Sequence, residues 1–164
     1  MIQVAIVTVS DSAVAGARAD RSGPMLRERL EALGFAVHAH ELVPDERKQI
    51  AALLRRLADS AEASVVLTTG GTGLALRDVT PEATRDVVER DVPGLAELMR
   101  AEGLKSTPFS VLSRAVAGVR GRCLIVNLPG SPKGAVQSLD AIAKLIPHIV
   151  DLLQGRTSHA DVPH

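Results

Sequence analysis

Aromatic residues are nearly absent from this 164-residue sequence, which has no tryptophan, no tyrosine and only two phenylalanines, Phe35 and Phe109. Proteins that bind single-stranded nucleic acids stack the bases on aromatic side chains, and this sequence has almost none. Lysine plus arginine and aspartate plus glutamate balance at 19 each, so no net positive charge attracts nucleic acid or an anionic membrane. We therefore expect neither nucleic acid nor a membrane as a partner.

Cysteine is equally scarce, because Cys123 is the only one and an internal disulfide is therefore excluded. It stands in the apolar run 123–126, which favours a buried structural thiol over a nucleophile. No run approaches the roughly 18 apolar residues of a membrane span, and no basic segment followed by an apolar stretch opens the chain. These features predict a soluble, cytoplasmic protein.

The hydrophobic residues that the sequence does contain are mostly aliphatic. They dominate the 46% hydrophobic content of a chain that is long enough to bury the core of one domain. Short β-branched runs alternate with stretches of helical period, which is typical of a mostly parallel sheet with helices on both faces. We predict an α/β fold: a single-domain, three-layer α/β/α structure over residues 1–155, followed by a polar C-terminal tail at 156–164.

Strands are predicted where β-branched residues cluster, and helices where apolar residues recur every three to four positions. Asp45 and Thr80 are expected as helix N-caps, and Pro147 is expected to kink the last helix. The predicted strands are residues 2–9, 35–43, 63–67, 117–120 and 123–128, of which the last two form a small antiparallel hairpin. The predicted helices are residues 22–33, 46–57, 81–90, 93–103 and 136–153, and residues 105–114 form a loop with at most one helical turn.

Two histidines, His38 and His40, differ by two positions in a predicted strand and are therefore expected on one face of the sheet. A histidine pair could begin a metal site, but no third ligand stands nearby in the sequence. A partly exposed face of the strand is the favoured interpretation.

Polar residues follow several of the predicted strands where each strand ends. Residues 10–12 follow the first strand, Asp45 follows the second, the glycine-rich stretch 68–83 follows the third, and residues 129–132 follow the last. In sheets of this kind ligands bind outside the carboxyl ends of the strands, near the point where the strand order reverses. The sequence therefore predicts one composite polar rim.

The glycine-rich stretch offers what phosphate binding requires. Its glycines let the backbone come close to a ligand and turn N–H groups toward it, and Asp78 offers a carboxylate that could hold a metal. It lacks the lysine of the common nucleotide-binding P-loop and the third glycine of the dinucleotide motif, which disfavours ordinary P-loop ATPases and NAD enzymes. The competing structural roles are a local turn bond for Asp78 and a helix cap for Asp45.

In these residues the chain resembles the MogA/MoaB-type molybdopterin adenylyltransferases, which include the G domain of gephyrin and its plant counterparts. The similarity runs from Val4 to about Leu153. Its motifs are residues 8–12, 20–23, 43–45, 69–83, 107–109, 112–115 and 127–132.

The resemblance implies that Mg²⁺, ATP and molybdopterin bind side by side. The terminal phosphate of the pterin would attack the α-phosphate of ATP, giving adenylyl-molybdopterin and pyrophosphate. By motif, Asp78 and Asp45 would be the catalytic residues that serve the magnesium. The residues that would frame the nucleotide are Gly71, Thr72, Gly73, Thr80 and Glu82. Those that would face the pterin or its phosphate are Ser10, Asp11, Asp20, Ser22, Ser113, Asn127, Gly130 and Ser131.

Two other interpretations remain open. The chain could be a non-catalytic, MoaB-like module that binds molybdopterin or acts as a scaffold, although such a module would not need both Asp45 and Asp78. It could also be a domain of the molybdate-insertion type, which the absence of that enzyme's additional domains disfavours. The resemblance further implies a homotrimer, or a hexamer as in the MoaB-like branch, and the molybdate-insertion enzyme as a partner.

Overall fold

Six strands form one sheet in the computed structural model, which describes residues 1–156. Across the sheet the order is β2 (Ala36–Val43), β1 (Gln3–Val9), β3 (Val65–Thr69), β6 (Cys123–Leu128), β5 (Ala117–Arg120) and β4 (Arg90–Asp91). The first four strands in this order pair in parallel, whereas β5 pairs antiparallel with both β6 and β4. The predicted mostly parallel sheet and its antiparallel hairpin are confirmed, and β4 is an additional short strand.

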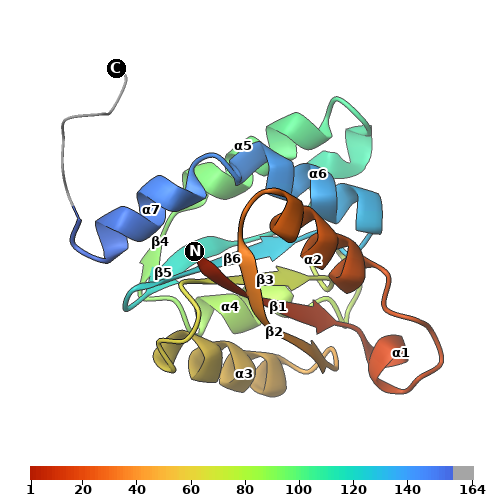
Figure 1. Cartoon of the computed structure of the whole chain (residues 1–164). Coiled ribbons are helices and arrows are strands. Elements are labelled where there is room, and N and C mark those ends of the chain that lie inside the picture. Colours follow the sequence, from red (N-terminus) through yellow and green to blue (C-terminus); the bar gives the residue numbers. More distant parts are fainter. Residues whose placement is uncertain (157–164) are drawn as a thin grey trace.

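Helices cover both faces of this sheet (Figure 1). One face carries α2 (Ser22–Ala32), α5 (Pro93–Gly103), α6 (Pro132–Ile142) and α7 (Ile146–Leu153), and the other carries α3 (Arg47–Asp59) and α4 (Thr80–Arg85). Two short elements, α1 (Asp11–Val14) and the 3-10 helix η1 (Pro108–Leu112), lie in connecting segments. The three-layer α/β/α architecture predicted from the sequence is therefore confirmed.

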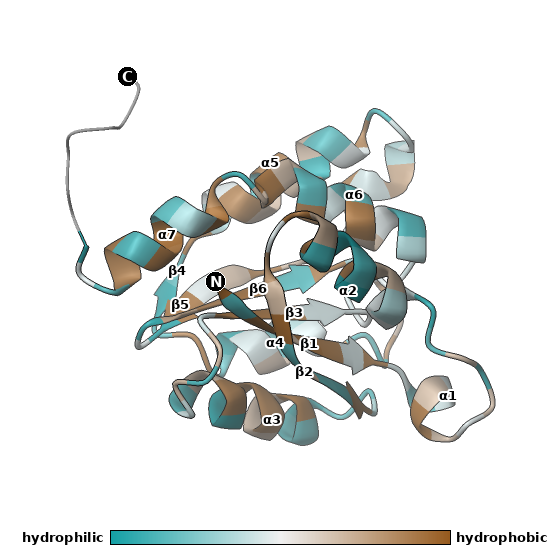
Figure 2. Cartoon of the chain, viewed as in Figure 1, coloured by the Kyte–Doolittle hydropathy of each residue, from teal (hydrophilic) through white to brown (hydrophobic). Residues whose placement is uncertain are grey.

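The sheet separates two hydrophobic cores, because successive side chains of each strand point to opposite faces. In β1, Val4 and Ile6 join the core under α2 and α6, whereas Ala5 and Val7 join the core above α3. This burial on both sides explains why the strands read as continuous apolar runs. Figure 2 shows hydrophobic and hydrophilic residues alternating along α3 and α7, as expected for helices with one buried side.

Two of the predicted helices end earlier than expected. The single kinked helix predicted for residues 136–153 is instead two helices, because Pro147 cannot donate an N–H bond to residue 143 and its ring crowds that carbonyl. The helix predicted for residues 81–90 stops at Arg85, and the chain then forms β4 beside β5. Pairing at the sheet edge thus overrides the helical tendency of this segment.

The histidines of β2 have separate partners. The register of β1 with β2 shifts at this point, so that Val37 and Ala39 face consecutive residues of β1 and His38 is left over as a bulge. His38 lies 3.2 Å from Glu62, whereas His40 lies 3.0 Å from Asp20. The bulge breaks the alternation on which the expectation of a shared face was based. Within residues 1–156 no three His, Cys, Asp or Glu side chains converge to hold a metal.

Cys123 is 1% exposed at the start of β6. Burial raises the pKa of its thiol to about 12. The prediction of a buried structural thiol is confirmed. In the part of the chain that the structure describes, no helix is long and apolar enough to cross a membrane. Of the polar tail predicted at residues 156–164, residues 157–164 lie outside the described residues.

Candidate functional site

The strand order reverses at β1, which places a crevice at the end of the sheet. From β1 the chain crosses to β2 on one side and later to β3 on the other. The loops that follow β1 and β3 therefore leave the sheet in opposite directions and open a space outside their carboxyl ends. The predicted polar residues 10–12 and 70–73 stand at this point.

Reciprocal hydrogen bonds join the loops that follow β1 and β2. The backbone N–H of Asp11 donates to Oδ2 of Asp45 over 2.9 Å, and the backbone N–H of Asp45 donates to Oδ1 of Asp11 over 2.9 Å. The expectation that Asp45 caps a helix is wrong, because the N-cap of α3 is Glu46 and its side chain makes no cap bond. The Asp45 carboxylate is thus held toward the rim by a neighbouring loop.

Arg77 ties the glycine-rich loop to the same pair of loops. Its guanidinium donates to both carboxylate oxygens of Asp11, over 2.6 and 3.0 Å, and to Glu46 over 3.0 Å. We did not predict a role for Arg77 from the sequence. The available signal was its position directly before Asp78, in a loop otherwise made of small and apolar residues.

The surroundings of Asp11 and Asp45 move their pKa values in opposite directions. The hydrogen bonds from Arg77 hold the pKa of Asp11 below its usual range. Burial raises the pKa of Asp45, the N–H of Asp11 opposes this shift, and the negative charges of Asp11 and Asp78 reinforce it. A metal cation would relieve this repulsion, because a carboxylate near like charges favours a positive partner.

The glycine-rich turn after β3 brings backbone N–H groups to the rim. Gly70 and Gly71 have φ values of 103° and 69°, which an L side chain rarely adopts. Thr80 fixes the turn from below, since its Oγ1 donates to the carbonyl of Gly70 over 2.9 Å and its N–H to that of Gly71 over 3.1 Å. Thr80 is fully buried and begins α4, so the expected N-cap role is wrong.

The N–H groups of this turn are available to a ligand. Within residues 1–156 no protein acceptor takes the backbone N–H of Gly71, Thr72 or Gly73. Successive unpaired N–H groups in a concave turn form an anion site. The glycine-rich turn therefore has the local geometry to bind phosphate oxygens.

Asp78 folds back over the end of this turn. Its Oδ2 accepts the N–H of Ala75 over 3.0 Å, which is the local turn bond considered above. That bond uses one oxygen only, and among the described residues Oδ1 receives no donor. Oδ1 of Asp45 is likewise free of protein donors in this part of the chain. Each carboxylate thus keeps one oxygen for a ligand.

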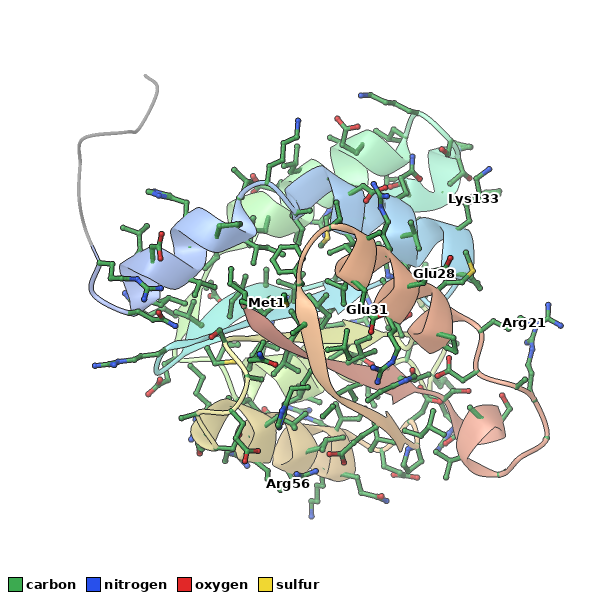
Figure 3. All side chains as sticks on the ribbon, viewed as in Figure 1. Met1, Arg21, Glu28, Glu31, Arg56 and Lys133 are labelled. Carbon is green, nitrogen blue, oxygen red and sulfur yellow. The ribbon has the colours of Figure 1, made fainter. Side chains whose placement is uncertain are left out.

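Two clefts flank the turn, and both reach Ser131, the N-cap of α6. The first, which we call the polar cleft, has a volume of about 440 Å³. Its side chains with polar or charged groups come from Thr8, Ser10, Ser12, Arg18, Asp20, Arg21, Ser22, Thr69 and Ser131. Figure 3 shows Arg21 projecting outward from the loop between α1 and α2.

The second, which we call the apolar cleft, has a volume of about 390 Å³ and lies between α5, η1 and α6. Thr72 and Gly73 form its border with the glycine-rich turn. Its apolar walls come from Leu74, Ala96, Met99, Phe109, Leu112 and Ala115. Sequence reasoning missed this wall, because its residues come from four separate segments: the loop after β3, α5, η1 and the segment before β5.

The predicted pterin-side residues are distributed unevenly over these clefts. Five of them line the polar cleft, namely Ser10, Asp20, Ser22, Gly130 and Ser131, whereas Ser113 lines the apolar cleft. Asp11 lies beside them in the ion pair with Arg77. Most of this group is therefore brought together, although its members come from four separate loops.

Asp20 is held by several donors. Its Oδ2 accepts the hydroxyl of Thr8 over 2.9 Å and lies 3.0 Å from Nε2 of His40. Its Oδ1 accepts the N–H of Gly23 over 3.0 Å, at the start of α2. The Asp20 carboxylate thus fixes the wall of the polar cleft, and we did not assign the supporting His40 from the sequence.

Asn127 does not reach the rim. It is fully buried in β6, where its amide nitrogen donates to Thr68 over 3.0 Å and to Thr84 over 2.9 Å. Its Oδ1 accepts the N–H of Val116 over 3.0 Å. The side chain predicted to face the pterin is instead bonded to β3, α4 and the segment before β5 below the rim.

Glu82 is also turned away from the rim. It forms an ion pair with Arg114, and the hydrogen bonds of that guanidinium lower the pKa of Glu82. Its second oxygen is buried without a partner among the described residues. The structure therefore brings Gly71, Thr72 and Gly73 to the predicted nucleotide site, with Thr80 and Glu82 behind them.

Comparison with known proteins finds similarity to molybdopterin-binding domains. A family model described as a probable molybdopterin binding domain matches residues 5–148. A molybdopterin adenylyltransferase of Helicobacter pylori strain J99 is 44% identical over 156 residues, covering 94% of this chain and 89% of that protein. The molybdopterin adenylyltransferase of Escherichia coli K12 is 37% identical over 168 residues, covering 94% of this chain and 86% of that protein.

A solved structure from molybdopterin biosynthesis is also similar to this chain. The crystal structure of the molybdopterin biosynthesis enzyme MoaB from Thermus thermophilus superposes with a TM-score of 0.89 at 55% identity. The aligned part covers 94% of this chain and 98% of that chain.

Replacing Gly70 by alanine should disrupt the turn. A Cβ atom at Gly70 would lie 2.4 Å from the carbonyl oxygen of Val9, which is backbone and cannot move aside. Gly34 is a matched control, because its φ is also positive, at 89°, but nothing lies within 4 Å of its Cβ position. We expect Gly34→Ala to lower the free energy of unfolding by about 1–2 kcal/mol and Gly70→Ala by about 1–3 kcal/mol more, as measured by urea unfolding. Equal losses in the two variants would contradict the close approach.

Proposed function

The chain belongs to the family described as probable molybdopterin-binding domains, and from this premise we propose that it is a molybdopterin adenylyltransferase of molybdenum cofactor biosynthesis. The enzyme transfers the adenylyl group of ATP to molybdopterin and releases pyrophosphate. The relatives in Helicobacter pylori and Escherichia coli, which carry this name, support the proposal.

One observation carries the proposal. The glycine-rich turn runs from one cleft to the other, since Gly70 lines the polar cleft and Gly73 the apolar cleft. The turn has a carboxylate beside each end: Cβ positions at Gly71 and Gly73 would lie 3.2 Å from Asp45 and 2.9 Å from Asp78. Two ligands can therefore meet over a turn that offers N–H groups and carboxylates together.

In this proposal the polar cleft takes molybdopterin and the turn with the apolar cleft takes ATP. An oxygen of the pterin's terminal phosphate forms a bond to the α-phosphorus of ATP, while the bond from that phosphorus to the bridging oxygen breaks and pyrophosphate leaves. No protein nucleophile is needed, because such transfers depend on alignment and on stabilising phosphate charge. In this proposal the N–H groups of Gly71, Thr72 and Gly73 align the nucleotide and stabilise the charge of its phosphates.

The donor set of the site fits magnesium. Mg²⁺ prefers one or two carboxylates together with phosphate and water oxygens. Among the described residues, Asp45 and Asp78 each keep one oxygen without a protein donor, and burial together with the charge of Asp78 raises the pKa of Asp45. These two residues would hold the ion, which when bound neutralises charge on the phosphates.

A second candidate is a MoaB-like protein that binds molybdopterin without turnover. The chain is 55% identical to a MoaB, although that protein is described as a molybdopterin biosynthesis enzyme. The two functions differ in one measurable product. A mixture of the protein, molybdopterin and Mg-ATP should release pyrophosphate if the protein is an adenylyltransferase. Tight molybdopterin binding without pyrophosphate release would instead establish the binding protein.

The proposal also covers the extent of the domain, the oligomeric state, the compartment and the partner of the enzyme. We propose that the domain covers residues 1–155, that it assembles as a homotrimer, with a hexamer as the alternative, and that it works in the cytoplasm. Its product would pass to the molybdate-insertion enzyme. The unpaired Cys123 thiol is compatible with a reducing compartment.

Removing either carboxylate should abolish turnover without unfolding the protein. Asp78→Asn and Asp45→Asn keep the side-chain shape but lose the charge that would hold the metal, so we expect kcat to fall on the order of 100-fold or more. Asp140→Asn is the matched control, because Asp140 pairs with Arg29 on the surface. Pyrophosphate release at saturating Mg-ATP measures the effect, and circular dichroism reports the fold. Unchanged turnover in Asp78→Asn would refute its role.

Activity should decline on acidification as Asp45 takes up a proton. Because burial raises the pKa of Asp45, its charge is lost at a higher pH than that of an exposed aspartate. Arg77 lowers the pKa of both Asp11 and Asp45, so Arg77→Ala should shift the acidic limb of the pH profile of kcat/KM to higher pH. The control is Arg56→Ala, since Arg56 pairs with Glu41 on the surface. An acidic limb that stays in place or moves to lower pH would rule out this coupling.

A further inference from the structure

Arg114 is the most heavily bonded side chain behind the glycine-rich turn. Its Nε donates to the carbonyl of Gly73 over 2.8 Å, and its Nη2 donates to the carbonyl of Asp78 over 2.7 Å. Its Nη1 binds Glu82, and its backbone N–H donates to the carbonyl of Thr72 over 2.9 Å. A single residue therefore holds both ends of the segment 72–78.

The segment 72–78 has few other means of keeping its place. Leu74 is 68% exposed and Leu76 is 99% exposed, so neither anchors the segment in a core. The remaining bonds are the local turn between Ala75 and Asp78 and the exposed ion pairs of Arg77. Exposed ion pairs contribute little stability. The position of Asp78 relative to the sheet thus depends on Arg114 together with the buried Thr80, two residues further along the chain.

Arg114 is itself attached to the core. Arg100, on α5, donates to the carbonyls of Ser113 and Ala115 over 3.4 and 3.3 Å, on either side of Arg114. Ala115 is buried, and the following residues continue into β5. The guanidinium of Arg114 thus connects the exposed rim segment to an element that is fixed by packing.

The charge of Arg114 is already balanced by Glu82. The hydrogen bond from the Arg114 guanidinium is the main reason that the pKa of Glu82 lies below its usual range. Arg114 faces two carbonyls and this carboxylate, and it does not line either cleft. Its contacts are those of a residue that orders the backbone, with its charge neutralised by a protein partner.

We propose that Arg114 is a positioning residue for adenylyl transfer, which acts by holding Asp78 and the N–H groups of the turn in place. The inference rests on the proposed function and extends it to a residue outside both clefts. A planar guanidinium can serve three acceptors at once in a fixed geometry, whereas a lysine ammonium cannot. Glu82 contributes to the same positioning role, because it fixes the orientation of Arg114.

The first test is the kinetics of Arg114→Ala and Arg114→Lys. Because a misplacement of about 1 Å can cost roughly 100-fold in rate, we expect kcat of Arg114→Ala to fall by about that factor, while KM for molybdopterin changes little. Arg114→Lys should retain part of the stability that Arg114→Ala loses, but its kcat should stay close to that of Arg114→Ala. Free guanidinium ion added to Arg114→Ala should partly restore kcat, which a general loss of structure would not allow. A rise in KM at unchanged kcat, or no rescue, would overturn the proposal.

Arg120 provides a matched control at the other end of the sheet. It donates to both oxygens of Asp59 and to the carbonyl of Val87, so that, like Arg114, it serves three acceptors of carboxylate and carbonyl type. Its side chain is 24% exposed, compared with 33% for Arg114. Arg120→Ala should lose comparable stability, with kcat unchanged and without a response to guanidinium. A loss of kcat like that of Arg114→Ala would mean that the effect is unspecific.

A double variant tests whether Arg114 acts through Asp78. In the Asp78→Asn background, Arg114→Ala should lower kcat by a smaller factor than in the wild type, because one of the groups that Arg114 positions is already gone. Fully additive losses would overturn the proposal.

Hydrogen exchange separates this proposal from the function on which it rests. The hydrogen-bonded amides of Ala75, Asp78 and Thr80 should exchange faster in Arg114→Ala than in the wild type and in Arg120→Ala, whether or not the wild type releases pyrophosphate. If the wild type shows no turnover, the adenylyltransferase proposal fails alone. If the exchange of these three amides is unchanged, the positioning role fails.

Discussion

The close approach of three backbone segments at the ends of β1, β3 and β6 is the constraint on which the site depends. A Cβ atom at Gly70 would meet the carbonyl oxygen of Val9, and one at Gly130 would lie 3.2 Å from the Cα of Gly70. The N–H of Gly70 meanwhile donates to the carbonyl of Leu128. Glycine is required here because any side chain would separate the strands. This contact places the glycine-rich turn between the two clefts, since Gly70 lines the polar cleft and Gly73 the apolar cleft.

Arginines then distribute the charge around that space. Arg77 on the outside and Arg114 on the inside each pair with a carboxylate, so that neither adds a free positive charge to the rim. Within residues 1–156, Asp45 and Asp78 each keep a carboxylate oxygen that no protein donor occupies. The site thus combines an electropositive turn made of N–H groups with two negative side chains, an arrangement suited to a phosphate and its counter-ion.

The sequence predicted the strands, the rim and the glycine-rich turn, because these depend on local patterns. Burial on both faces made each central strand a run of apolar residues, and the turn required glycine at fixed positions. The side-chain partners were less predictable. Asp45 looked like a helix cap but binds Asp11, 34 residues away, and Asn127 looked like a rim residue but is buried under α4. Such contacts depend on how distant loops meet, and no local pattern encodes that.

The buried thiol of Cys123 gives the molecule an internal reporter of unfolding. It lies at the start of a central strand, is 1% exposed, and is the only cysteine in the chain. With a pKa of about 12 it stays protonated at neutral pH, and only a thiolate reacts readily with alkylating reagents. Labelling of Cys123 therefore requires the sheet to open. The rate at which an alkylating reagent consumes this thiol would measure the opening of the native sheet around β6, without a cysteine introduced by mutation.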